Sequence, residues 1–188
     1  MIDNIHKYRV LNKLKSVYRF SSVDSRKESS AEHTWGTLVL ADFFMSSFDF
    51  AVDRLKVYEL LMYHDVPEIY AGDTVLHPEL FQDSNFKVEK ETLSANRLKD
   101  ELPSPINSKF FDLFNEFESA QTREAKFAKA IDALEAEIHE MDYKEDWKGW
   151  SRDFLVENKA FLFVDFPELE VVFFELLDFF VENGYFDQ

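Results

Sequence analysis

Hydrophobic positions recur at helical spacing in several segments of the chain, and polar breaks separate these segments. The stretch from Trp35 to Phe43 keeps mostly apolar residues at this spacing, and Ser29 and Glu32 before it form the S-x-x-E pattern of a capping box. The pattern predicts a helix that begins near Ala31.

A second apolar pattern runs from Asp53 to His64 and predicts a helix that is buried on most sides. Pro67 suits the first turn of a short following helix, which Gly72 and Asp73 should end. We expect a loop from Thr74 to Ser84, where Pro78 stands among polar residues.

Three later segments also carry helical patterns. Phe86 to Leu102 is charged and amphipathic, and prolines follow it. Thr122 to Met141 has an apolar stripe with Asp132 beside it, and the Phe-rich, acidic stretch from Val164 to Phe186 predicts a terminal helix that covers the core. These patterns predict an all-α fold.

Composition supports this prediction and narrows the chemistry. The chain has 188 residues, which fits one domain over residues 1–188, and its 21 Phe against 4 Gly and 5 Pro favour long helices. It has no Cys, so a metal ion would have to bind nitrogen and oxygen ligands.

The formal net charge of −16 disfavours long nucleic acids and anionic membranes as partners, because such partners need an extended basic surface. The N-terminal segment lacks the apolar core of a signal peptide, and no apolar run reaches membrane-spanning length. We therefore expect a cytoplasmic protein that takes a small-molecule substrate.

His64 and Asp65 stand together at the end of an apolar helix, where two polar side chains are costly to bury without partners. A divalent cation would satisfy both. His33 lies in the first turn of an earlier helix and Asp132 on a later one, so a helical bundle could bring all of them together. Taken alone, His33 is also typical of a helix cap or a core residue, and Asp132 of a solvated face.

Two further carboxylates follow the His-Asp pair. Glu68 comes four residues after His64, on the same helical face, and could act as general base. Asp73 follows Gly72, which allows the chain to turn the carboxylate toward the same cleft, where it could orient water or protonate the leaving group. The remaining histidines are interpreted as surface residues outside the site: His6, His77 and His139.

In sequence order, His33, the pair His64-Asp65 and Asp132 resemble the H…HD…D pattern of the HD phosphohydrolase superfamily. The stretches Glu28–His33, His64–Asp73 and Lys129–Glu135 resemble its 5'-deoxynucleotidase branch more specifically. The resemblance runs from about Leu14 to Met141 and implies an HD-domain helical bundle. Residues 142–188 form a C-terminal helical extension in this interpretation.

The resemblance implies roles for individual residues. The metal ligands it implies are His33, His64, Asp65 and Asp132, and its catalytic carboxylates are Glu68 and Asp73. An Arg-Trp pair contacts the substrate in that branch, and the nearest equivalents here are Arg19 and Phe20, where Phe departs from Trp. Arg26 and Lys90 are interpreted as ordinary surface cations.

We therefore expect hydrolysis of deoxyribonucleoside 5'-monophosphates with one divalent ion, which could be Co, Mn, Ni, Fe or Mg. The resemblance also makes a homodimer possible. One alternative is alarmone pyrophosphohydrolysis, but those enzymes follow the Glu with Asp, and Ile69 stands at that place here. The other is a non-catalytic metal-binding helical scaffold.

Overall fold

The computed structural model describes residues 1–78 and 84–186 of the chain. In chain order, the elements are α1 (Ile2–Tyr8), the 3-10 helix η1 (Arg9–Ser16), β1 (Tyr18–Val23), β2 (Arg26–Ser29), α2 (Ser30–Ser47), α3 (Arg54–Tyr63), α4 (Glu68–Ala71), α5 (Ser84–Glu101), α6 (Ile106–Ser119), α7 (Arg123–His139), η2 (Glu140–Asp142), η3 (Lys144–Trp147), α8 (Arg152–Lys159), η4 (Ala160–Leu162) and α9 (Pro167–Glu182).

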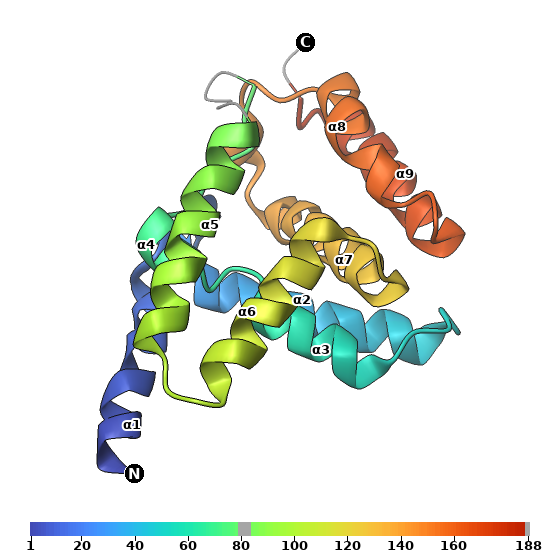
Figure 1. The fold of residues 1–188 in the computed structure, drawn as a ribbon. Helices are drawn as coiled ribbons and strands as arrows, with labels where there is room; N and C mark the ends of the chain where they lie inside the picture. The colour runs from blue at the N-terminus through green and yellow to red at the C-terminus, as the bar shows by residue number, and fades with distance from the viewer. Residues whose placement is uncertain (79–83, 187–188) are drawn as a thin grey trace.

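Helices α2, α3 and α7 pack against one another at the centre of the bundle. Helices α5 and α6 pack together beside them, with α4 against α5, and α9 packs on α7. Figure 1 shows α8 and α9 lying together at one side of the molecule. The stripe on α7 predicted from the sequence is buried, because Ala128, Ile131 and Leu134 have no exposed surface. The fold is all-α, as predicted.

The predicted helix ends are confirmed. Ser29 and Glu32 form the capping box at the start of α2. Asp53 caps α3 by accepting hydrogen bonds from the first-turn amides. The short helix α4 follows Pro67 and ends at Gly72, whose φ of 74° suits a residue without a Cβ.

The prediction of helix throughout was wrong between Tyr18 and Ser29. These residues form an antiparallel hairpin, β1 and β2, with Asp24 at a φ of 51° in its turn. The hairpin is short and has a register irregularity between Tyr18 and Ser22, so its sequence lacks a clean alternation of apolar and polar residues. It places Arg19 beside the central helices.

The C-terminal segment is more divided than expected. The predicted helix over residues 164–186 is present as α9, which buries Leu169, Phe173 and Phe180 completely. Helices α6 and α8 were not predicted from the sequence. Of the predicted loop, residues 74–78 are neither helix nor strand, Ser84 already begins α5, and residues 79–83 lie outside the described part of the chain. Among the described helices, none is long and apolar enough to cross a membrane.

Candidate metal centre and active site

The structure brings the predicted metal ligands together at one point. His33 Nε2 lies 2.8 Å from Asp132 Oδ1, and His64 Nε2 lies 3.5 Å from the same oxygen. Asp65 completes the group, with Oδ1 3.2 Å from His64 Nε2 and Oδ2 4.0 Å from His33 Nε2. Helix α2, the end of α3 and helix α7 thus supply two imidazoles and two carboxylates.

The orientation of the two imidazoles fits a cation. His33 Nδ1 contacts Glu135 Oε2 at 2.5 Å, and His64 Nδ1 contacts the carbonyl oxygen of Leu61 at 2.6 Å. Both Nε2 atoms therefore face the carboxylates. His64 Nε2 and Asp65 Oδ2 are buried without a hydrogen-bond partner, which is costly unless another group satisfies them. A divalent ion with nitrogen and oxygen ligands would do so.

Charge coupling holds these groups in ionised form. Burial and the nearby Arg19 lower the pKa of His33, but hydrogen bonds to Asp132 and Glu135 outweigh them and raise it to about 9. Burial raises the pKa of Asp65, but His64, His33 and Arg19 together outweigh burial and lower the pKa to about 2. The pKa of Asp132 lies well below its usual range, because hydrogen bonds from both imidazoles overcome its burial. The carboxylates that attract these protons would equally attract a cation.

Glu68 lies beside this centre, in the first turn of α4. It is buried, and Ser30 Oγ donates a hydrogen bond to its Oε2 at 2.6 Å. Burial, followed by repulsion from Asp65 and Asp73, raises the pKa of Glu68 well above the ordinary value. A carboxylate in this environment takes up a proton more readily than an exposed one, as a general base must.

Arg19 reaches into the site from β1. Its Nε lies 3.2 Å from Glu28 Oε2, and its Nη1 lies 3.6 Å from Asp65 Oδ2 and 3.9 Å from Asp73 Oδ1. Phe20 also faces the site, with its ring centroid 5.3 Å from that of His77. The hairpin thus brings both predicted substrate contacts to the site, with Arg19 at Asp65 and Phe20 against His77.

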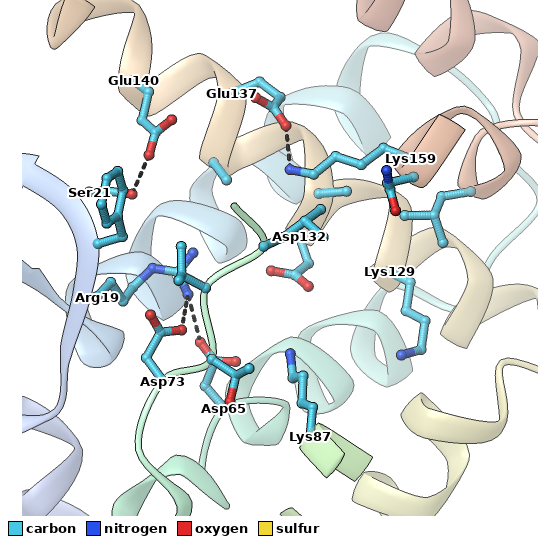
Figure 2. A pocket seen from close by; sticks show the side chains of 18 of the residues that line it. Arg19, Ser21, Asp65, Asp73, Lys87, Lys129, Asp132, Glu137, Glu140 and Lys159 are labelled. Carbon is cyan, nitrogen blue, oxygen red and sulfur yellow. Dashed lines mark hydrogen bonds and ion pairs between the residues drawn. The ribbon is translucent and has the colours of Figure 1, made fainter. Parts of the chain in front are cut away.

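A cavity of about 420 Å³ lies at this site, and its lining includes Arg19, Phe20, Asp65, Glu68, Asp73 and Asp132. Figure 2 shows Arg19 pointing toward Asp65 and Asp73, while Lys87 and Lys129 extend into the same space from other helices. The far end of the cavity comes from the C-terminal segment. Its lining residues there include Trp150, Asn158, Lys159, Phe161 and Leu162.

The lysines of the cavity were not predicted from the sequence. Lys90 was the lysine of α5 weighed as a phosphate contact, but the lysine of α5 that lines the cavity is Lys87, almost one turn earlier. Lys129 was quoted only within a motif, and Lys159 was not considered. Arg26 pairs with Glu32 at 2.8 Å outside the cavity, which confirms its interpretation as a surface cation. A predicted helical face does not say which lysine of α5 turns inward, so the sequence held no clear signal.

The interpretation of the remaining histidines was right for His6 and wrong for His77. His6 is exposed. His77 is buried, with its ring against Phe20 and Trp150, because the segment after α4 folds back over the cavity. His139 is partly buried and its Nε2 contacts the carbonyl oxygen of Ser22 at 2.8 Å, so it is not a free surface residue either.

Comparison with known proteins decides the family. A family model described as HD domain matches residues 11–161. The chain belongs to the HD domain family. This HD domain is similar over 100% of its length to a predicted metal-dependent phosphohydrolase from Magnetospirillum magnetotacticum, with 30% identity, a TM-score of 0.86 and 95% of that chain covered. An HD-domain phosphohydrolase from Listeria innocua, 21% identical with a TM-score of 0.57 over 95% of this chain and 86% of that one, shares the fold.

Curated relatives of this HD domain are named 5'-deoxynucleotidase HDDC2. The Xenopus laevis protein is 28% identical over 64% of this chain and 57% of its own length. The Danio rerio protein is 24% identical over 85% of this chain and 80% of its own length. The match to the Dictyostelium discoideum protein covers 48% of that relative, so the chain spans about half the length of the first relatives it matches.

Proposed function

We propose that this HD domain is a metal-dependent phosphomonoesterase that hydrolyses deoxyribonucleoside 5'-monophosphates to nucleoside and phosphate. The observation that carries the proposal is the convergence of His33, His64, Asp65 and Asp132 at a cavity that Glu68 and Arg19 also line. The names of the curated relatives support the choice of substrate. They support it by family analogy, whereas the side chains support the reaction type.

In this proposal, His33, His64, Asp65 and Asp132 hold one divalent ion, whose identity among Co, Mn, Ni, Fe and Mg is open. When bound, such an ion supplies a Lewis acid for a phosphoryl oxygen and makes water more acidic. Glu68 accepts the proton of the attacking water, helped by its raised pKa. Asp73, which faces Arg19 across the cavity rim, orients water or delivers a proton to the leaving oxygen.

Cations from different elements balance the charge of the phosphoryl group. Arg19 stands on one side of Asp65, and Lys87 and Lys129 line the cavity from α5 and α7. A chain with a net charge of −16 repels phosphate in general, so a local group of cations is required to bind a phosphate ester. The cavity concentrates these cations where the reaction needs them.

The other end of the cavity suits a nucleoside. Phe20, Trp150 and Phe161 supply aromatic surface, and the ion pair of Lys159 and Glu137 supplies a donor and an acceptor. Pockets of this size class, largely apolar with a few placed polar groups, are typical of small-molecule sites. This composition supports a substrate with a base and a sugar over a bare phosphate ester.

Three further predictions belong to the same proposal, and they concern domain organisation, cellular location and oligomeric state. Residues 1–188 act as one domain, which is supported by the contribution of the segment after Met141 to the cavity wall. The protein works in the cytoplasm, an expectation that rests on the sequence arguments given above. The family resemblance makes a homodimer possible.

The test is a panel of deoxyribonucleoside and ribonucleoside monophosphates and an alarmone, incubated with Co, Mn or Mg and with a chelator. We expect release of phosphate from deoxynucleotides that stops when the chelator is added. Pyrophosphate from the alarmone alone would favour the second enzyme class. A complete lack of metal-dependent release would favour the scaffold and contradict the proposal.

A further inference from the structure

Glu135 is a carboxylate of the site to which the mechanism assigns no role. It lies on α7 almost one turn after Asp132, and only 8% of its surface is exposed. Its Oε2 lies 2.5 Å from His33 Nδ1, on the side of the ring opposite Asp132. Helix α7 therefore supplies a carboxylate to each nitrogen of the His33 imidazole, Asp132 to Nε2 and Glu135 to Nδ1.

This contact determines the orientation of the His33 ring and which of its nitrogens keeps a proton when a metal ion is bound. When Nε2 of His33 is a metal ligand, it carries no proton. The ionised carboxylate of Glu135 can only accept a hydrogen bond, so the remaining proton of the imidazole resides on Nδ1 and the lone pair of Nε2 is left for the cation. His64 differs, since its Nδ1 contacts the neutral carbonyl oxygen of Leu61. Of the two imidazoles, His33 is the one with a charged partner at Nδ1.

Gly36 explains why Glu135 fits at this place. A Cβ added to Gly36 on α2 would overlap Glu135 Oε1 and lie 2.8 Å from its Cδ. Glycine in a helix interior normally destabilises the helix, so it needs a local reason. The carboxylate of Glu135 occupies the space that a side chain at position 36 would fill.

We propose that Glu135 is a positioning residue of the metal centre, which orients and strengthens His33 as a ligand, and that Gly36 makes room for it. The inference rests on the metal centre of the proposed function. It goes beyond it, because neither residue touches the cation or the substrate in this scheme.

The surroundings of Glu135 argue for an internal network over a second cation site. Glu28, Glu135 and His139 have ligand atoms within 4.8 Å of one another. Each of them nevertheless has its own protein partner: Glu28 pairs with Arg19, Glu135 with His33, and His139 with the carbonyl oxygen of Ser22.

The test measures Co²⁺ binding to the purified full chain by calorimetry, without any substrate. Loss of a partner of this kind typically weakens metal affinity by about 10–100-fold, and we expect this for Glu135→Ala and a smaller loss for Glu135→Gln, which keeps a hydrogen-bonding group. The absorption spectrum of bound Co²⁺ should also shift, which a purely structural role would not cause. Glu124→Gln, at the start of the same helix and outside the cavity, is the matched control and should bind as the parent chain does.

Gly36→Ala gives an independent test that leaves Glu135 in the sequence. The added methyl group should push the carboxylate off His33 and weaken Co²⁺ binding about as much as Glu135→Ala. Adding Gly36→Ala to Glu135→Ala should then cost nothing further, since the space is free. Parent-like affinity and spectrum in both single variants, or fully additive losses in the double variant, would overturn the proposal.

This outcome is separable from that of the proposed function. If Glu135 acts as inferred but the substrate is misassigned, the variants lose Co²⁺ affinity and the deoxynucleotide assay detects no release of phosphate. If phosphate release is as proposed but Glu135 has no positioning role, the assay succeeds and Co²⁺ affinity does not respond to either single variant.

Discussion

The two ends of the cavity are built in different ways. At the metal end, one oxygen of Asp132 lies 2.8 Å from His33 Nε2 and 3.5 Å from His64 Nε2, and packed helices hold these side chains at fixed positions. At the nucleoside end, Phe161 is 63% exposed and follows α8 in a single 3-10 turn. Charged groups that act on a phosphate must be held at fixed distances, whereas a base and a sugar can be bound through surface contact and complementary shape.

The largest expected effect comes from breaking the metal end. Asp132→Ala removes the carboxylate that contacts both imidazoles, so we expect loss of high-affinity ion binding and a fall of phosphate release to background. Calorimetry with Co²⁺ and a phosphate assay measure the two losses. Asp112→Ala, an exposed aspartate on α6, is the control and should behave as the parent chain. Equal losses in both variants would mean that the effect is not local.

The next effect separates chemistry from ion binding. Glu68→Gln keeps the shape and can still accept from Ser30, but it removes the proton acceptor. We expect kcat to fall by about a hundredfold or more with nearly unchanged ion affinity. A Glu68→Gln enzyme with full turnover would remove Glu68 as the general base.

A smaller effect is expected from the cations around the phosphoryl group. Lys87→Met removes a lysine of the cavity wall that is also partly solvated, so we expect a loss of about tenfold in kcat/KM. Lys90→Met, on the same helix but outside the cavity lining, is the matched control. If the two variants lose activity equally, Lys87 contributes only through the overall charge of the protein and not through its place in the cavity.

The sequence predicted the metal end far better than the nucleoside end. His64 and Asp65 are adjacent, and Glu68 and Asp73 follow within the same short stretch, so a local motif contains much of the chemistry. Trp150 and Lys159 come from separate turns of a segment without a recognised motif, and only tertiary packing brings them to the cavity. Their role therefore had no local signal to predict it.

The same contrast holds for the fold. Capping residues and apolar spacing predicted the start of α2 and the end of α4, because these signals act within a few residues. The β1-β2 hairpin was missed, since its strands are short and irregular and β1 contacts η3, which lies far along the chain. Sequence spacing carries no information on such contacts.

The nucleoside end is tested by Phe161→Ala. The ring is exposed, so its removal should not disturb the core, and KM for deoxynucleoside monophosphates should rise by about tenfold. Deoxyribose 5-phosphate, which lacks the base, should show no such rise. Phe43→Ala, an equally exposed ring on α2, is the control. An equal rise in KM for both substrates would place the base elsewhere.

The smallest effect on turnover, but a measurable one on stability, is expected at Glu140. Burial, and then the nearby Glu137, raise its pKa to about 7 despite a hydrogen bond from Ser21. The folded chain then holds a proton that the unfolded chain loses near pH 4.5, so this group lowers stability as pH rises from 4.5 to 7, by up to about 3 kcal/mol. Glu140→Gln should remove this part of the decline, measured by urea unfolding at pH 5 and pH 8. An unchanged pH profile would contradict the assignment.

The most direct test of the central claim is anomalous diffraction from crystals grown with Mn²⁺. The account predicts one strong peak bounded by His33 Nε2, His64 Nε2 and the carboxylates of Asp65 and Asp132. A peak among Glu28, Glu135 and His139 with none at the predicted ligands, or no peak in the cavity at all, would contradict it.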